Sequence, residues 1–513
     1  MQVVLVETQH LGLPQNRSFG VVDALQIRLE HLFQALPPST LLICHNSHSW
    51  PDFRAGKANR YSRIVLREKS SARKLLSRNT EVGRQRTECR QTLPALWMAL
   101  ILAGAPLYGQ LTGAQKQLNL DSFETVWTTI RDQHWEKNPG GLDWQAVHDE
   151  FRPKIEKTET MEDVRAVLRD MLDRLHQSHF AILPFAIYQD IEHSEEGDGT
   201  PGFDVRALDG RAIVTEVAPG SVAAKARVQA GWEVASAAGK DLAPLIAQLA
   251  SVPDLHELAL ERAVMARITG PAGATRRFIF LDGANASRTL DLRLAPPRGE
   301  MAPFGNLPPQ HVWFESKKLG NTGYVRFNMF LDLVRVMPSF GNAVEACQRC
   351  DGMIIDLRGN PGGIGGMAMG MAGWLVDKPG QRLGTMYMRG ATLNFVINPR
   401  AETFNGPVAV LVDGSSASTS EIFAGGLKDL GRARIFGTRT AAAALPSLIA
   451  KLPNGDGFQY AIANYISEGG KPLEGNGVTP DVEVKLTRDA LLAGHDPVVD
   501  AALDWIQKRK GAK

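Results

Sequence analysis

The clearest hydrophobic pattern lies in the last third of the chain, where short apolar runs alternate with segments whose apolar residues recur every three or four positions. Strands are predicted at residues 323–327, 352–357, 408–412 and 434–436, and helices at residues 331–347, 365–376 and 418–430. Apolar strands that alternate with helices are typical of a largely parallel sheet buried on both faces. This pattern predicts an α/β core over residues 310–513.

Two other patterns precede the core. Apolar stripes between residues 120 and 180 predict helices, and the last helix gives way to the apolar stretch 181–185 just after Ser178 and His179. We therefore expect a helical leader over residues 118–185.

Residues 198–295 show short alternating strands separated by Gly and Pro turns, which is typical of a small β-rich module. Pro and Gly cluster again at residues 296–309, and this cluster predicts a linker between the module and the core.

Residues 1–110 do not show the pattern of a domain, and they contain an uncharged apolar run at residues 93–107 that follows Arg84, Arg86 and Arg90. A basic stretch before a short apolar run is the layout of a secretory signal, and the run is short for a membrane span of about 20 residues. One interpretation is that the true start lies near residue 85, which predicts an exported protein, periplasmic or extracellular, without an integral membrane span in its mature form. The alternative is a buried helix.

Composition excludes little. The chain has 513 residues, 22% of them charged, with a net charge of +2, so nothing favours a nucleic-acid or anionic-membrane partner. Its four cysteines are too few for a disulfide scaffold, and Cys347 and Cys350 form a lone pair without a second pair to complete a zinc site. We interpret that pair as packing, and we expect no metal or cofactor.

Two turns carry candidate chemistry. The strand at residues 408–412 passes through a turn of small residues into a helix that begins near Ser418, where backbone N–H groups and the helix dipole can stabilise an oxyanion. A serine at this position is also an ordinary helix cap. The turn 358–363 ends in Gly362 and Gly363, whose backbone can approach a ligand closely, although a plain turn has the same composition.

Three motifs occur in order: DLRGNPGG at residues 356–363, GSSASTSEIFAGGLKD at 414–429, and KPLEGNGVTPDVEV at 471–484. From about residue 120 to the end, the chain resembles the C-terminal processing (tail-specific) peptidase family of serine proteases. The resemblance implies a crotonase-like (ββα) core of the α/β class, with a helical leader and an inserted PDZ-like domain.

The resemblance also implies roles for residues. Ser418 matches the nucleophile, and the backbone N–H groups of Thr419 and of Gly362 or Gly363 match the oxyanion hole. Members of the Ser–Lys type carry a lysine base 25 residues after the serine, but here that position is Ala443, which cannot accept a proton.

The tricorn-like branch of the family takes its base from the leader instead. It uses a histidine preceded by a serine, which match His179 and Ser178, and a glutamate late in the core, for which Glu474 is the candidate. Glu421 and Glu468 compete with Glu474 for that role. An imidazole with an ordinary pKa of about 6.5 suits a proton shuttle at neutral pH.

We therefore expect an exported, tail-specific serine endopeptidase that cleaves polypeptides through an acyl-enzyme. Gly202 and Phe203 are the candidate residues for capturing a chain end in the PDZ-like domain, which could act instead as a lid. The alternative function is an inactive family member that binds peptides or other ligands. No oligomeric state follows from the sequence.

Overall fold

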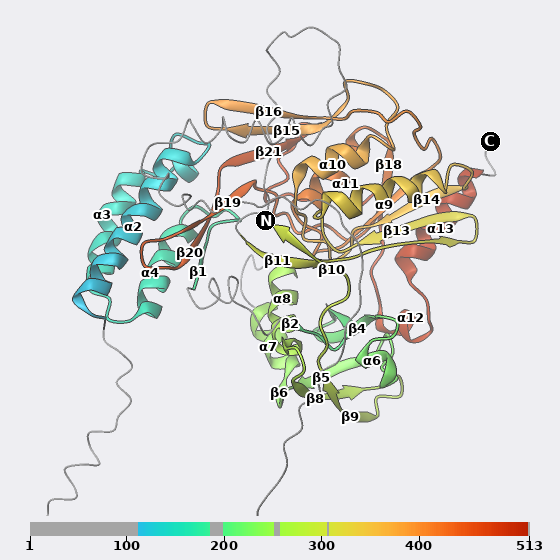
Figure 1. Cartoon of the computed structure of the whole chain (residues 1–513), viewed down its shortest axis with the longest axis horizontal. Coiled ribbons are helices and arrows are strands. Elements are labelled where there is room, and N and C mark those ends of the chain that lie inside the picture. The colour runs from blue at the N-terminus through green and yellow to red at the C-terminus, as the bar shows by residue number, and fades with distance from the viewer. Residues whose placement is uncertain (1–110, 185–197, 251–256, 305–306, 511–513) are drawn as a thin grey trace, which may run out of the picture. The chain divides into compact units, whose positions relative to one another are not determined.

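The computed structural model describes residues 111–184, 198–250, 257–304 and 307–510, all of them within one compact unit (Figure 1). The predicted extension 1–110, with its apolar run at 93–107, lies outside the described residues. Within the described ranges, none of the helices combines the length and the hydropathy that a membrane crossing requires.

The helical leader, blue to teal in Figure 1, forms as its apolar stripes predict. Its helices are α2 (Gly113–Gln133), the short 3-10 helix η2 (Pro139–Gly141), α3 (Trp144–Glu156) and α4 (Met161–Asp173). Thr112, Asp143 and Thr160 cap α2, α3 and α4 with side-chain oxygens that accept backbone N–H groups. The predicted stripes face one another in a single apolar cluster.

A small sheet joins the leader to a later part of the chain. Strand β1 (Ala181–Leu183) pairs antiparallel with β20 (Gly457–Ala461), and β20 pairs with β19 (Ser447–Lys451). Leu452, Phe458 and Tyr460 of this β19–β20 hairpin are buried in the apolar cluster of the leader. The hairpin therefore packs as part of the leader although the sequence places it more than 260 residues later.

The inserted module, green in Figure 1, confirms the predicted β-rich region. Its elements are β2 (Asp198–Gly199), β3 (Phe203–Leu208), β4 (Arg211–Val217), α6 (Val222–Lys225), β5 (Glu233–Ala237), β6 (Lys240–Asp241), α7 (Leu242–Ala250), α8 (Glu257–Ile268), β7 (Gly270–Pro271), β8 (Thr275–Leu281) and β9 (Ser287–Arg293). The main sheet has the order β3-β4-β5-β8-β9, so β3 lies at an edge, and α8 packs beside it. Helices α7 and α8 were not predicted.

The linker predicted at residues 296–309 is wrong. This stretch enters an antiparallel hairpin of β10 (Glu300–Phe304) and β11 (Leu307–Val312), with Glu300 opposite Val312. Proline cannot donate to a strand ladder, which is why a proline-rich stretch does not resemble a strand, but an isolated two-stranded hairpin tolerates proline on its outer edges.

The core confirms the predicted parallel sheet. Its strands are β12 (Phe314–Leu319), β13 (Thr322–Phe327), β14 (Gly352–Asp356), β17 (Val408–Val412), β18 (Ala433–Gly437) and β22 (Val482–Glu483), in the order β12-β13-β14-β17-β18-β22. Only the pairing of β12 with β13 is antiparallel in this sheet.

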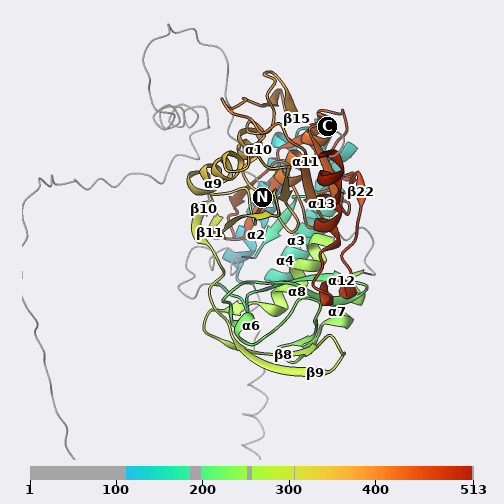
Figure 2. The same cartoon turned by 90° about the vertical axis from the view of Figure 1, so that its right-hand side faces the viewer.

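Both faces of the core sheet are covered. Val408, Val410 and Val412 of β17 face α9 (Leu333–Glu345), α10 (Gly365–Ala372) and α11 (Thr419–Asp429), whereas Ala409 and Leu411 face α13 (Pro497–Lys510). Figure 2 shows α13 on the side of the sheet away from α9 and α10. Strand side chains alternate between the two faces, so a strand buried on both sides is apolar at every position, as the sequence of β17 is.

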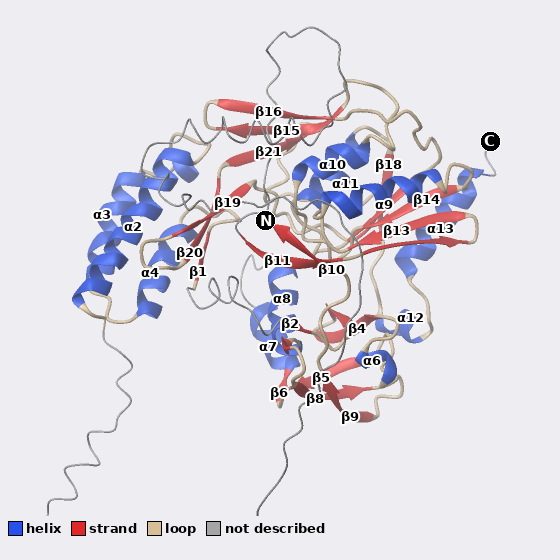
Figure 3. Ribbon diagram, in the orientation of Figure 1, coloured by secondary structure: helices blue, strands red, loops and turns tan. Residues whose placement is uncertain are grey.

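A second sheet covers α11. Strands β15 (Arg382–Met388), β16 (Ala391–Val396) and β21 (Ala463–Ser467) form it in the order β16-β15-β21, and β15 packs against α11 (Figure 3). Helix α11 therefore lies between two sheets, and its residues from Thr419 to Leu427 are all buried.

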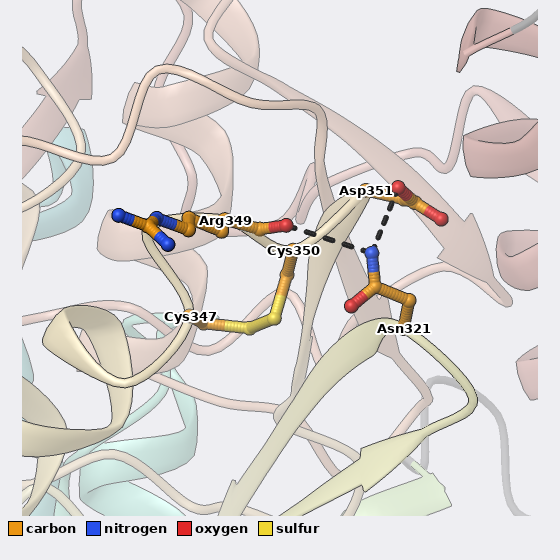
Figure 4. Close-up of a disulfide and its surroundings, with 5 residues drawn as sticks. All are labelled: Asn321, Cys347, Arg349, Cys350 and Asp351. Carbon is orange, nitrogen blue, oxygen red and sulfur yellow. Dashed lines mark hydrogen bonds between the residues drawn. A yellow bond between two sulfur atoms is a disulfide. The ribbon is translucent and has the colours of Figure 1, made fainter.

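Cys347 and Cys350 are joined by a disulfide, which corrects the interpretation of the pair as packing (Figure 4). Helix α9 ends at Glu345, and the tight turns that follow bring the two Cα atoms to 4.9 Å, within the usual range for a disulfide. Gly323 of β13 makes room for it, because a Cβ there would lie 2.4 Å from Cys347 Sγ. Asn321 also holds this turn, donating to Asp351 Oδ1 at 2.9 Å.

Candidate active site

Ser418 lies at the turn between β17 and α11 in a backbone conformation that few non-glycine residues adopt, with φ 57° and ψ −118°. Its N–H donates to the carbonyl of Ala443 and to Glu421 Oε2, each at 2.9 Å. Its hydroxyl is fully buried and makes no hydrogen bond to any described residue. Strained residues of this kind cost about 1–3 kcal/mol and concentrate at functional sites.

The glycine turn that follows β14 lies directly against this serine. A Cβ on Gly362, which has φ +97°, would lie 2.7 Å from Ser418 Cβ and 2.8 Å from the nitrogen of Thr419. The Thr419 hydroxyl donates to the Gly363 carbonyl at 2.9 Å and so ties the start of α11 to the turn. Only glycine allows the two segments to approach this closely.

The two glycines differ as possible oxyanion donors. The N–H of Gly362 donates to Asn360 Oδ1 at 3.0 Å, whereas the N–H of Gly363 donates to none of the described residues. Between the two glycines that the sequence left open, Gly363 is therefore the one whose N–H remains available to a ligand.

The structure brings Ser178, His179 and Glu474 together. Ser178 Oγ lies 2.6 Å from His179 Nδ1 and donates to Glu474 Oε2 at 2.8 Å, and the N–H of Ser178 donates to Glu474 Oε1 at 2.6 Å. The carboxylate thus binds the serine twice, and the serine binds the imidazole. Sequence analysis placed these residues in one unit but did not predict that Ser178 bridges the other two.

This arrangement decides which nitrogen of His179 carries the hydrogen. An ionised carboxylate only accepts hydrogen bonds, so the single hydroxyl hydrogen of Ser178 must point to Glu474. Ser178 Oγ can then only accept from His179, which places the imidazole hydrogen on Nδ1. The lone pair of Nε2 is left to accept a proton.

Electrostatics keep this imidazole neutral. Burial, together with the positive charge of Arg262 on α8, holds the pKa of His179 well below its ordinary value of about 6.5. A histidine with a lowered pKa is unprotonated at neutral pH, as a general base must be.

The two competing glutamates have other partners. Glu421 is fully buried and accepts from the hydroxyl of Thr440 and from the backbone N–H groups of Ser418, Ala442 and Ala443. Its burial raises its pKa to about 7. Glu468 binds Arg382 near the surface. Neither contacts Ser178 or His179, so Glu421 holds a loop and Glu474 holds the histidine segment.

The loop that Glu421 holds, residues 440–444, includes Ala443 at the position of the absent lysine. It contacts both Ser418 and the Ser178–His179–Glu474 unit. The carbonyl of Ala443 accepts from the N–H of Ser418, and the N–H of the next residue, Ala444, donates to Glu474 Oε2 at 3.0 Å. The two ends of a single peptide group, the one between Ala443 and Ala444, therefore bind the serine and the carboxylate of the histidine unit. The hydroxyl of Ser418 itself does not hydrogen-bond to His179 in this structure.

The inserted module reaches the same site through α8. Leu258 packs against the small apolar cluster of Ala417, Ala441 and Ala443 beside the serine. Next to it, Arg206 Nε of β3 lies 3.0 Å from Asp413 Oδ2 and 3.1 Å from Glu261 Oε1. The module therefore lies directly on the turn that presents Ser418.

The charge of the Arg206 guanidinium acts on four carboxylates: Asp204, Glu257, Glu261 and Asp413. Burial and the charge of Asp413 raise the pKa of Glu261 to about 8, against the opposing effect of Arg206. Sequence analysis did not single out Arg206 or Glu261. No local pattern could have, because Arg206 and Asp413 are 207 residues apart.

The candidate chain-end site is partly occupied by the module itself. The N–H of Gly202 donates to Thr200 Oγ1 at 3.1 Å, and the side chain of Phe203 is buried in the core of the module. A carboxylate would have to replace the Thr200 hydroxyl at Gly202. Within the described part of the chain, no three His, Cys, Asp or Glu side chains gather as a metal site would require.

Two stretches of the chain match models of known protein families. Residues 321–484 match peptidase family S41, and residues 119–173 match the tricorn protease C1 domain. The first range includes Ser418, the glycine turn and Glu474, and the second covers most of the leader helices before His179.

Individual relatives are distant. Carboxyl-terminal-processing peptidase 3 of Arabidopsis thaliana chloroplasts is 25% identical over 70% of this chain and 67% of its own length. Putative tricorn protease homolog 2 of Streptomyces coelicolor is 23% identical over 74% of this chain, but the match spans only 32% of that protein. The solved structure of mature CPAF shares the fold with a TM-score of 0.52 at 15% identity, covering 78% of this chain and 97% of that one.

Proposed function

The chain belongs to peptidase family S41 of serine proteases, and we propose that it is an endopeptidase in which a histidine of the leader replaces the lysine base. The observation that carries this proposal is the hydrogen-bonded series from Glu474 through Ser178 to His179 Nδ1. It supplies an oriented, neutral imidazole to a site whose lysine position is Ala443, while Glu421, the other acceptor beside Ser418, is occupied by four donors.

The reaction follows from these contacts. Ser418 Oγ attacks the scissile carbonyl carbon while its proton passes to His179 Nε2, and the resulting oxyanion lies at the N–H groups of Gly363 and Thr419. His179 then gives the proton to the leaving amine, which departs and leaves an acyl-enzyme on Ser418. Water hydrolyses the acyl-enzyme by the same two proton transfers in reverse. Substrate binding must first bring Nε2 within hydrogen-bond reach of Oγ, since such bonds often tighten only in the complex.

We further infer that the core has the crotonase-like fold and that the inserted module is PDZ-like. The parallel strands β13, β14, β17 and β18 with their intervening helices support the first inference, and the open edge strand β3 beside α8 supports the second. A substrate tail added to the edge of β3 would explain tail-specific cleavage.

Tail specificity predicts a preference for a free chain end. A peptide with a C-terminal amide should be cleaved with a kcat/KM roughly tenfold lower than the same peptide with a free carboxylate, because one charged hydrogen-bonded group is lost. Equal turnover of the two peptides would exclude capture of the chain end.

We propose that the protein acts after export, outside the cytoplasm. The disulfide between Cys347 and Cys350 supports this location, because structural disulfides persist in oxidising compartments and are rare in reducing ones. Protein recovered from the exported fraction should resist alkylation at both cysteines until a reductant is added. Recovery of the protein only from the cytoplasm, with both thiols reduced, would contradict export.

The peptidase proposal is tested with a fluorophosphonate probe, which reacts with activated serines. We expect labelling of the wild-type protein at Ser418, and loss of both labelling and peptide cleavage in Ser418→Ala and His179→Ala. His176→Ala is the matched control, since His176 lies in the same segment with an exposed side chain and φ 50°. Absence of labelling in the wild type, or full labelling of His179→Ala, would overturn the proposal and favour a non-catalytic binding protein.

A further inference from the structure

The candidate base lies on an irregular segment that is held by contacts with distant parts of the chain, among them the two bonds of Ser178 to Glu474. Helix α4 ends at Asp173, and both His176 and His179 have left-handed backbone conformations, with φ 50° and 64°. The segment becomes regular only in β1, which has three residues and pairs with β20 and no other described strand. The position of His179 therefore depends on Glu474 on one side and on the β19–β20 hairpin on the other.

A buried ion pair between Arg165 and Asp456 fastens the tip of that hairpin to the leader. Arg165 of α4 donates to Asp456 through two parallel hydrogen bonds, Nε to Oδ2 at 3.0 Å and Nη2 to Oδ1 at 2.9 Å. The Asp456 side chain is fully buried and that of Arg165 is 17% exposed. A forked arginine–carboxylate pair fixes orientation as well as distance, which a single lysine contact cannot do.

Neighbouring contacts fix the same tip. The N–H of Asn454 donates to Ser122 Oγ at 3.0 Å, and its side-chain amide donates to Asn119 Oδ1 at 3.1 Å, both on α2. Asn454 Oδ1 in turn accepts from the N–H of Asp456. The tip is thus held by two leader helices at once.

The other end of the hairpin leads to the nucleophile. Strand β19 begins at Ser447, three residues after Ala444, and the loop before it binds the N–H of Ser418 and the carboxylate of Glu474. Figure 1 shows β1 and β20 next to α4, with β19 leading back toward the core. One hairpin therefore connects the loop that holds the serine to the strand that follows the histidine.

We propose that Arg165 and Asp456 are positioning residues for the His179 base. They hold the β19–β20 hairpin against the leader, the hairpin sets the register of β1, and β1, together with Glu474, sets the place of His179 relative to Ser418. This inference rests on the proposed role of His179. The pair touches neither substrate nor reacting atoms, and its effect is on alignment, where a displacement of about 1 Å can cost 10²-fold in rate.

The test compares Arg165→Met, which removes the charge and the fork, with Arg165→Lys, which keeps the charge and loses the fork. Arg169→Met is the matched control, since Arg169 lies one turn further along α4 in an exposed pair with Glu162. We expect kcat on a peptide substrate to fall at least about tenfold in Arg165→Met with KM within about twofold, an intermediate loss in Arg165→Lys, and no change in Arg169→Met.

Hydrogen exchange supplies a readout that does not need activity. Amides of residues 174–184 should exchange faster in Arg165→Met than in the wild type, while those of the core strand β17 should not change. Should Arg165→Met fail to fold, the same comparison is made with Arg165→Lys. Unchanged kcat in the folded variants, an equal loss in Arg169→Met, or unchanged exchange at residues 174–184 would each overturn the inference.

The two proposals fail in different ways. A wild-type protein in which Ser418 never reacts would refute the peptidase proposal, and the exchange experiment would still decide whether the ion pair holds the His179 segment. An active wild type whose Arg165 variants keep full kcat would refute the positioning role alone.

Discussion

At the scale of single residues, the site depends on which atoms can donate and which can accept. Ser178 has one hydrogen and two partners, so its bond to Glu474 dictates that His179 donates through Nδ1 and accepts through Nε2. Glu421 shows the opposite use of a buried carboxylate, because its four donors are all structural. Glu421 and Glu474 both bind the loop at residues 440–444, but only Glu474 binds Ser178, and the residue type alone does not reveal this difference.

Ser178→Ala tests the relay. Without the hydroxyl, nothing fixes the imidazole ring or its tautomer, so kcat/KM should fall on the order of 10²-fold, part of the 10²–10⁴-fold that general-base catalysis contributes. Ser178→Thr keeps the hydroxyl and should retain most activity. Steady-state kinetics on one peptide substrate makes the comparison, and equal rates for the alanine variant and the wild type would remove Ser178 from the mechanism.

At the scale of elements, the buried strand–turn–helix from β17 to α11 is the most strongly determined part of the site. The strand is apolar on both faces, and the helix is buried between two sheets, so the turn that carries Ser418 cannot move independently. The end of α9 is held in another way, by the disulfide that closes the turn before β14. The burial of α11 fixes the turn after β17, and the disulfide fixes the turn before β14.

The disulfide should contribute modestly to stability. A cross-link that closes a loop of about four residues restricts the unfolded chain by about 2 kcal/mol in the chain-entropy treatment. The Cys347→Ser, Cys350→Ser double variant should lose about that much free energy of unfolding in urea, and reductant should lower the wild type to the same level. Reductant added to the double variant is the control, and an effect there would show that the loss has another origin.

At the scale of the whole described unit, the inserted module is fastened to the core at several separate places. Arg206 reaches Asp413 beside the nucleophile turn, and Arg326 of β13 binds Glu216 of β4. Arg488 of α12 (Arg488–Leu492) is buried and donates to the carbonyls of Gly231 and Asp282. These contacts make the module part of the site rather than an appendage.

The contact at Arg206 predicts a pH dependence of stability. The pKa of Glu261 is raised from 4.5 to about 8, so the folded protein keeps this proton after the unfolded chain has lost it. The stabilisation is complete below about pH 4.5 and is lost as the pH rises toward 8, by a few kcal/mol at most.

Chemical denaturation of the wild type and of Glu261→Gln between pH 5 and pH 9 measures this effect. Glutamine stays neutral at every pH, so the variant should lose less stability than the wild type over this range. Glu162→Gln, at an exposed position on α4, is the control and should follow the wild type. Parallel curves for Glu261→Gln and the wild type would show that Glu261 is already ionised at the lower pH.

The sequence by itself predicted the central strands β13, β14, β17 and β18 and the helices between them, and the family resemblance supplied the roles of the candidate residues. The strands β12, β15, β16, β21 and β22 were not predicted. Continuous apolar strands, amphipathic helices and glycine turns depend on neighbours within a few positions, so the strand 408–412, the turn at Ser418 and the helical leader were all predictable. The prediction of a linker at residues 296–309 was wrong because prolines are not typical of strands, although the β10–β11 hairpin forms there. The disulfide was missed because it depends on a tight turn that brings Cys347 and Cys350 together.

Only the tertiary structure decided which glutamate binds Ser178, which glycine offers its N–H, and that a late hairpin completes the leader. These contacts join residues far apart in the chain: Ser178 and Glu474 are separated by 296 positions, and Arg165 and Asp456 by 291. A side chain's partners across such distances are selected by the packing of whole elements, and no pattern of neighbouring residues contains that information.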